Sequence, residues 1–138
     1  MSDLPECDQP LHPRALAGLR LFNAGEFFEA HEELETAWRE ESGPIRSLYQ
    51  GILQVAVAYL HLTMGNYDGT LRMYERSLKW LSQWPDSCRG VEVARLRADL
   101  ETVIAAVRRL GPERLAEFDR ALLRPVIWHE KDKSLPPS

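Results

Sequence analysis

The side chains best suited to chemistry are a histidine and a glutamate placed four residues apart in one predicted helix. His31 and Glu35 project from the same face of that helix, about one turn apart. An imidazole and a carboxylate at this spacing can ligate one divalent transition metal. Because the stripe through Phe27 and Leu34 is apolar, we expect the pair to face the core. A buried carboxylate needs a partner, which predicts either a shared cation or a hydrogen-bonded lock.

The next predicted helix offers polar side chains that would complete either arrangement. Gln50, Gln54 and His61 lie at offsets of four and seven on an otherwise apolar segment. If this stripe faces the preceding helix, His31, Glu35 and His61 form a set of two histidines and one carboxylate. The two glutamines would then support that set by donating hydrogen bonds. A set of this kind with open positions suits iron, zinc or manganese.

Two functions remain open from these residues. In the first, the chain is a metal-binding protein, with hydrolase and oxygen-handling chemistry among the options. In the second, it is a non-catalytic helical interaction module or homo-oligomer, and the His/Glu/Gln cluster locks its core. The run from His31 to Glu35 is similar to the zincin pattern but has glutamate where the second histidine belongs, which disfavours metalloprotease chemistry. The sequence indicates no substrate.

The residues around the pair resemble a known family. His31, Glu35 and Trp38 form a His-x-x-x-Glu-x-x-Trp pattern, and a Phe-Asn-x-Gly-x-Phe-Phe-Glu-Ala-His-Glu run that begins at Phe22 overlaps it. The pattern continues with Gln50-Gly51 and Gly65-Asn66. From about residue 16 to 81 the chain is similar to the bacterial and archaeal helical family catalogued as Domain of Unknown Function 309. The resemblance implies a helical fold and a suspected metal role for the His-Glu pair, and it implies no activity; His61 lies outside the signature. We expect Trp38 to be a packing anchor.

Apolar stripes of helical period predict an all-α fold, a compact antiparallel bundle of five to six helices. The longer helices are expected over about 13–23, 26–40, 44–64, 67–83 and 91–110. A short sixth helix would carry Leu115, Phe118 and Leu122. Short loops favour antiparallel neighbours, and we expect the second and third helices at the centre. No segment alternates with period two, so no strand is expected.

A chain of 138 residues fits one domain. We expect an extended lead-in over 1–12, a single helical domain over 13–128 and a flexible tail over 129–138. Gly25-Glu26-Phe27 and Gly65-Asn66-Tyr67, forty residues apart, each follow one helix and open another. Two copies do not make a stable solenoid, so we interpret this echo as two similar helix hairpins.

Charge and cysteine content disfavour several classes of protein. The formal net charge of -4 provides no general attraction to nucleic acid. No apolar run approaches the ~20 residues that span a bilayer, and the acidic N-terminus does not resemble a signal peptide. Cys7 and Cys88 form no Cys-x-x-Cys motif, so we expect reduced thiols in a cytoplasmic protein. The partners that remain are a second copy of the chain or a small molecule of unknown identity.

Overall fold

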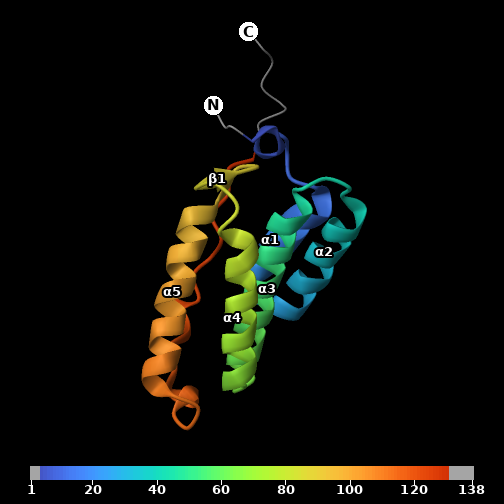
Figure 1. The fold of residues 1–138 in the computed structure, drawn as a ribbon. Coiled ribbons are helices and arrows are strands. Elements are labelled where there is room, and N and C mark those ends of the chain that lie inside the picture. Colours follow the sequence, from blue (N-terminus) through green and yellow to red (C-terminus); the bar gives the residue numbers. More distant parts are fainter. Residues whose placement is uncertain (1–3, 131–138) are drawn as a thin grey trace.

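Five α-helices make up most of the computed structural model, which describes residues 4–130 (Figure 1). They are α1 (Pro13–Asn23), α2 (Phe27–Glu40), α3 (Arg46–Thr63), α4 (Tyr67–Leu81) and α5 (Val93–Leu110). The predicted all-α helical bundle is therefore confirmed. None of the helices in the described part of the chain is both long and apolar enough to cross a membrane.

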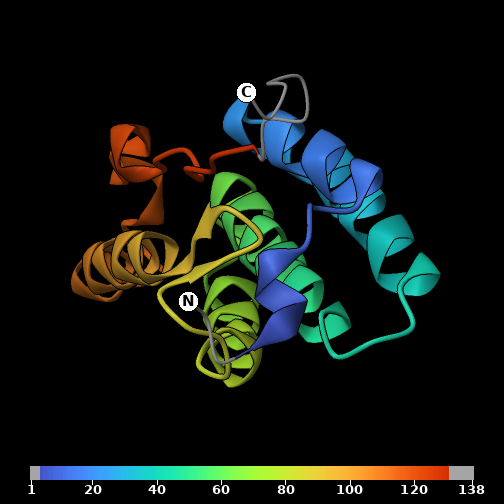
Figure 2. The ribbon, with the colours of Figure 1, turned by 90° about the horizontal axis from the view of Figure 1, so that it is seen from above.

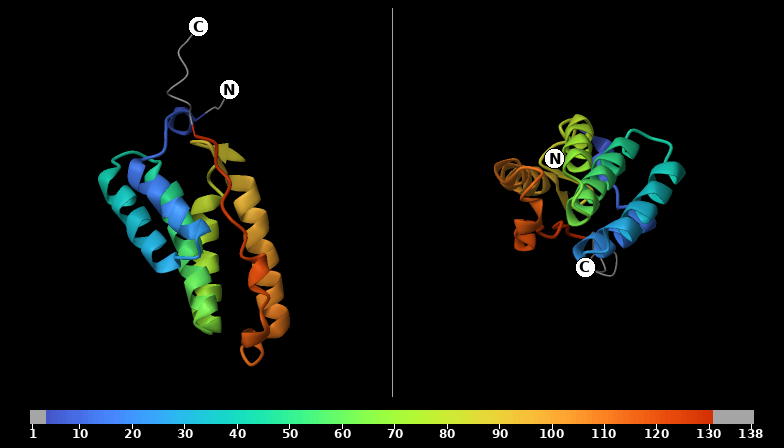
Figure 3. Two further views of the ribbon diagram at one scale, coloured as in Figure 1. Left: turned by 180° about the vertical axis from the view of Figure 1, so that it is seen from behind. Right: turned by 90° about the horizontal axis from the view of Figure 1, so that it is seen from below.

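α3 is the central helix, with α2 packed against one side and α4 against the other. Ten of its residues are buried, among them Tyr49 and Tyr59. α2 buries only a narrow stripe of four residues. It lies at the edge of the molecule (Figures 1 and 3). The prediction that α2 shares the centre is wrong, because a helix with one apolar stripe has one face to bury.

The turns between α1 and α2 and between α3 and α4 have the same geometry. Gly25 and Gly65 adopt left-handed φ values of 80° and 77°, which glycine tolerates without strain. The next residue's N–H then reaches back to the helix, Glu26 to the Leu21 carbonyl at 2.9 Å and Asn66 to the His61 carbonyl at 2.8 Å. These are Schellman caps. The repeated Gly-x-aromatic pattern in the sequence therefore corresponds to two similar helix hairpins.

The predicted sixth helix is replaced by two short 3-10 turns, Leu115–Glu117 and Arg120–Leu122. Phe118 between them has an extended backbone, φ -60° and ψ 133°, which interrupts any continuous helix. The Asp119 side chain accepts a hydrogen bond from the Ala121 N–H and begins the second turn. A segment this short between proline residues cannot offset the cost of nucleating a helix.

A small hairpin also departs from the prediction that no strand would form. β1 (Ser87–Cys88) and β2 (Val91–Glu92) pair antiparallel. Arg89 and Gly90, at φ 50° and 82°, make the left-handed two-residue turn that suits such hairpins. Strands of two residues are too short to show an alternating pattern in the sequence.

The C-terminal segment returns to this hairpin. Trp128 forms a bridge with Val91, and the His129 Nε2 atom lies 2.7 Å from the Glu92 carboxylate. In Figure 2 the segment, coloured red, crosses from the α5 side of the molecule to the α1 side. Of the tail predicted over 129–138, residues 131–138 lie outside the described residues.

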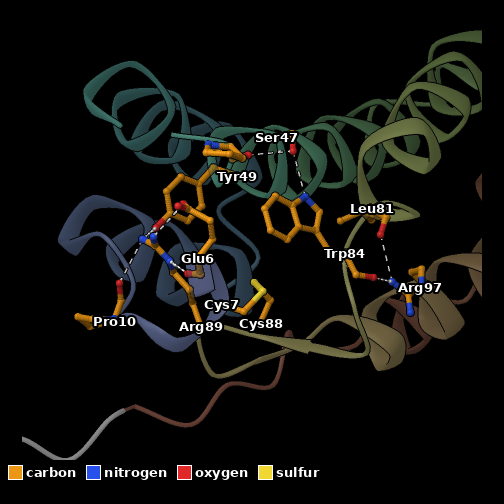
Figure 4. Close-up of a disulfide and its surroundings, with 11 residues drawn as sticks. Glu6, Cys7, Pro10, Ser47, Tyr49, Leu81, Trp84, Cys88, Arg89 and Arg97 are labelled. Atoms are coloured by element: carbon orange, nitrogen blue, oxygen red, sulfur yellow. Dashed lines mark hydrogen bonds and ion pairs between the residues drawn. A yellow bond between two sulfur atoms is a disulfide. The ribbon is translucent and has the colours of Figure 1, made fainter. Parts of the chain in front are cut away.

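A disulfide joins Cys7 to Cys88 across 81 residues of sequence (Figure 4). The expectation of two reduced thiols is therefore wrong. Cys7 lies in a 3-10 turn, Pro5–Asp8, so the predicted lead-in is not wholly extended. The β-hairpin places Cys88 beside this turn, and both cysteines are buried. Sequence spacing could not predict the pair, because its geometry depends on how distant elements pack.

Arg89 holds the N-terminal segment against the bundle (Figure 4). Its side chain is buried and donates hydrogen bonds to the carbonyls of Glu6 at 2.6 Å and Pro10 at 3.3 Å. It also donates to the Glu41 carboxylate at 3.3 Å and to the Tyr49 hydroxyl at 3.2 Å. One guanidinium thus connects the N-terminal segment, the end of α2 and α3.

Candidate functional site

His31 and Glu35 lie toward the outer side of α2 rather than in the core. The His31 Nε2 atom is 3.9 Å from Glu35 Oε2, and the two side chains are 26% and 38% exposed. Arg39, one turn further on, forms an ion pair with Glu35. The expectation that the pair faces the core is wrong, because the buried stripe of α2 runs beside it. That stripe consists of Phe27, Ala30, Leu34 and Ala37.

The polar residues predicted on α3 have separate surroundings. His61 is in the last turn of α3, where its Nδ1 atom lies 3.1 Å from the Asn66 side-chain amide. Gln50 is half-buried, and Gln54 is buried with no hydrogen-bond partner for Oε1 in the described part of the chain. Within residues 4–130 no group of three or more His, Cys, Asp or Glu side chains is placed to hold a metal ion. His31 and Glu35 therefore form a pair without a third ligand from the described residues.

The outward face of α2 carries a stripe with symmetric spacing. Phe28 and Trp38 lie five residues on either side of position 33, and His31 and Glu35 lie two residues on either side of it. With 3.6 residues per turn, these four positions fall within an arc of about 80°. We call Phe28, His31, Glu35 and Trp38 the α2 stripe. A symmetric stripe matters because it can match a second copy of itself when the two helices run antiparallel.

The two ends of the α2 stripe differ in exposure. Phe28 is 51% exposed, and its ring centroid lies 5.8 Å from that of His31. Trp38 is half-buried: the Arg46 guanidinium sits 4.4 Å from its ring centroid, and Arg46 Nε donates to the Trp38 carbonyl at 2.8 Å. Arg46 thus covers one face of the indole, while half of the Phe28 side chain is open to solvent.

Sequence reasoning missed three residues that organise these surfaces. Phe28 could have been found, because it falls outside the apolar stripe and completes the symmetric spacing around position 33. Asn23 hydrogen-bonds the Val126 backbone twice, donating to its carbonyl at 2.9 Å and accepting from its N–H at 2.8 Å. Nothing local to the sequence indicates that partner or the role of Arg89, because both depend on contacts about 40 to 100 residues away.

Tyr59 carries a buried hydroxyl that has no hydrogen-bond partner among residues 4–130. Its ring packs against Phe22 and Phe27, with centroids 5.5 Å from each. Burial, and to a smaller extent the charge of Asp99, raises the pKa of Tyr59 well above its usual value. The hydroxyl is therefore shielded from bulk solvent, and no residue in the range 4–130 replaces the hydrogen bond that water would make.

Tyr59→Phe is expected to raise the free energy of unfolding by about 1 kcal/mol, because it removes an unsatisfied buried donor. The difference should widen above about pH 10, where unfolded tyrosine loses a proton that the native side chain keeps. Urea unfolding at pH 7 and pH 10.5, at one protein concentration, measures both effects. Tyr67→Phe on the half-buried Tyr67 is the control. A loss of stability in Tyr59→Phe would mean that the hydroxyl has a partner.

The fold and these surfaces define a small helical domain built from two similar hairpins and a fifth helix. Residues 15–73 match the family model described as Domain of unknown function (DUF309), and the predicted resemblance is confirmed over this segment. The α2 stripe lies inside it, whereas Cys88, Arg89 and α5 lie beyond it. An uncharacterized protein of Aquifex aeolicus (strain VF5) is 30% identical over 95 residues, which are 68% of this chain and 28% of that protein. The match thus spans little more than a quarter of that relative's length.

Proposed function

We propose that this chain is a non-catalytic helical interaction module that pairs with a second copy of itself through the α2 stripe. The symmetric spacing of the four side chains on an edge helix is the observation that carries the proposal. Most soluble oligomers are two-fold symmetric, and a two-fold interface uses the same patch on both copies. A patch that is already symmetric about its own midpoint satisfies this requirement.

Antiparallel pairing of α2 about position 33 would match the stripe residue by residue. Phe28 of one copy meets Trp38 of the other, and His31 meets Glu35. Two aromatic contacts would then flank two polar ones, the composition typical of interface centres. In this arrangement Arg39, in the last turn of α2, would approach the first turn of α2 in the second copy, which carries Glu29, and this pairing of charges favours the antiparallel orientation.

Phe28 supplies the apolar area that such an interface would bury. It is one of three large hydrophobic side chains that are exposed in the described part of the chain; the others are Leu4 and Met64. Phe28 lies on the same face of α2 as His31 and Glu35, which are both partly exposed. An aromatic ring in this position gains free energy when a partner covers it.

Phe28→Asp is expected to weaken self-association by at least about 30-fold, the effect of removing a central aromatic anchor. Sedimentation velocity over a dilution series measures the dissociation constant. Met64→Asp is the matched control, because Met64 is 70% exposed at the end of α3 and lies off the stripe. Equal weakening in both variants, or none in Phe28→Asp, would contradict an interface centred on the stripe.

A divalent metal is a second candidate, favoured by one observation. His31 Nε2 and Glu35 Oε2 lie only 3.9 Å apart and are both partly exposed. Two copies paired through α2 would supply two histidines and two glutamates, enough for a four-coordinate zinc, manganese or iron ion. Elemental analysis of tag-free protein beside Glu35→Gln separates the cases. Near-stoichiometric metal that Glu35→Gln loses would support this candidate, and metal-free protein that takes up no added ion would exclude it.

A cytoplasmic location is also part of the proposal. The balance of charged and apolar residues supports a location in water. The Cys7–Cys88 disulfide is the observation that counts against this location, because disulfides are rare in the cytosol of most organisms. Both sulfur-bearing residues are buried, which protects the bond from reducing agents while the protein is folded.

A further inference from the structure

Two adjoining pockets lie where the helix turns meet the segment that follows α5. The first has a volume of about 410 Å³ and lies between the α1–α2 turn and residues 120–125. The second, of about 440 Å³, lies between the α3–α4 turn and residues 112–120. Thr63 and Arg120 line both. In Figure 3 this segment, coloured orange to red, runs back along the helices.

The walls of the first pocket are fixed by contacts within the protein. Asn23, which lines it, holds the C-terminal segment through its two hydrogen bonds to Val126. Phe22 and Phe27 are almost fully buried and pack edge to face with centroids 5.3 Å apart, and they form an aromatic wall that presents only its edge to the pocket. Leu123 adds an apolar side chain from the opposite wall. The space is therefore bounded by anchored elements on both sides.

Arg120 is the one charged side chain among the residues that line the first pocket. Its Nη2 atom donates to the Thr63 carbonyl at 3.3 Å, which holds the guanidinium between the two pockets. No carboxylate in residues 4–130 forms an ion pair with it, so its other N–H groups have no acidic partner there. A single planar guanidinium suits one carboxylate, which can accept two parallel hydrogen bonds.

We propose that the first pocket binds a small free carboxylic acid with an apolar body. The carboxylate would lie on Arg120, and the apolar part would lie between the aromatic wall and Leu123. The volume falls within the range of small-molecule sites, in which a few polar groups fix the orientation of the ligand. A single cation favours a monoanion over a phosphate dianion. Glu113, which lines only the second pocket, directs the charged end of the ligand to the first.

An NMR titration with 4-phenylbutyrate and its uncharged amide, 4-phenylbutyramide, tests the site. We expect millimolar or tighter binding of the acid, with shifts at the Gly25 and Thr63 amides, and at least tenfold weaker binding of the amide. Arg120→Gln should weaken binding of the acid at least tenfold. Arg120→Lys keeps the charge but loses the planar guanidinium, so its affinity for the acid should lie between those of wild type and Arg120→Gln. Arg124→Gln is the matched control: Arg124 is exposed, as Arg120 is, and the substitution removes the same charge at a position outside the lining.

Several results would overturn this assignment. They are equal affinity for the acid and the amide, equal losses in Arg120→Gln and Arg124→Gln, or no shifts at either amide. A short peptide with a free C-terminal carboxylate that binds more tightly than the acid would reassign the pocket to a chain terminus. Thermal unfolding of each variant verifies folding, and Arg120→Lys decides the case if Arg120→Gln is unfolded. The α2 stripe takes no part, so Phe28→Asp should bind the acid as wild type does.

Discussion

Replacing Cys7 and Cys88 by serine together is expected to lower the free energy of unfolding by about 4–5 kcal/mol. The disulfide closes a loop of 81 residues, and a link of this length removes much of the conformational freedom of the unfolded chain. Stabilities of small domains are about 5–15 kcal/mol, so the loss is a large part of the total. Urea unfolding monitored by circular dichroism, at one protein concentration, measures it.

The reduced wild-type protein is the control for this experiment. If the serine side chains pack as well as the thiols, reduced wild type and the double variant should unfold at the same urea concentration. Oxidised wild type should unfold at a clearly higher one. Coincident curves for all three would contradict a stabilising role for the disulfide.

Arg89→Met is expected to lower the free energy of unfolding by about 2–4 kcal/mol. Methionine keeps much of the side-chain length but removes every donor of the buried guanidinium. The carbonyls of Glu6 and Pro10 and the Glu41 carboxylate would each lose a hydrogen bond. Acceptors left unpaired cost more than the bonds contribute when formed, although partial exposure of the carboxylates moderates the effect. Urea unfolding again gives the change.

Arg14→Met provides the comparison for Arg89→Met. Arg14 makes an exposed ion pair with Glu33, with an N–O distance of 3.1 Å, so its loss should cost no more than about 1 kcal/mol. Hydrogen exchange adds a local readout: in Arg89→Met the amides of residues 5–12 should exchange faster, while those of α3 keep their order of protection. Similar costs for the two substitutions would mean that Arg89 is not the connection between the N-terminal segment and the bundle.

Local signals in the sequence predicted the helices well. Apolar periodicity identified the five helices, and Gly25 and Gly65 identified two turns that share one cap geometry. Each of these features depends on residues within about one turn of one another. The conformation of the segment after α5 was harder to predict, because it depends on tertiary contacts such as the Asn23–Val126 hydrogen bonds.

The candidate site was predicted in part. The spacing of His31 and Glu35 correctly placed them on one face and near each other. The prediction that this face is buried was wrong. Neighbouring positions on a helix differ by about 100°, and the buried stripe of α2 includes Leu34 but not His31. The disulfide and the Arg89 contacts could not be predicted, since they join segments that are distant in the sequence.

Sedimentation equilibrium of metal-free, tag-free wild-type protein over a wide concentration range tests the central proposal most directly. Pairing through the α2 stripe predicts a mass of twice the 15.8 kDa chain at high concentration, a decline toward the single-chain mass on dilution, and no loss of the dimer in the presence of a chelator. A dimer that forms only after metal is added would contradict metal-free pairing and support a metal site made by His31 and Glu35 of both copies. A mass of one chain at every concentration, with and without metal, would contradict it.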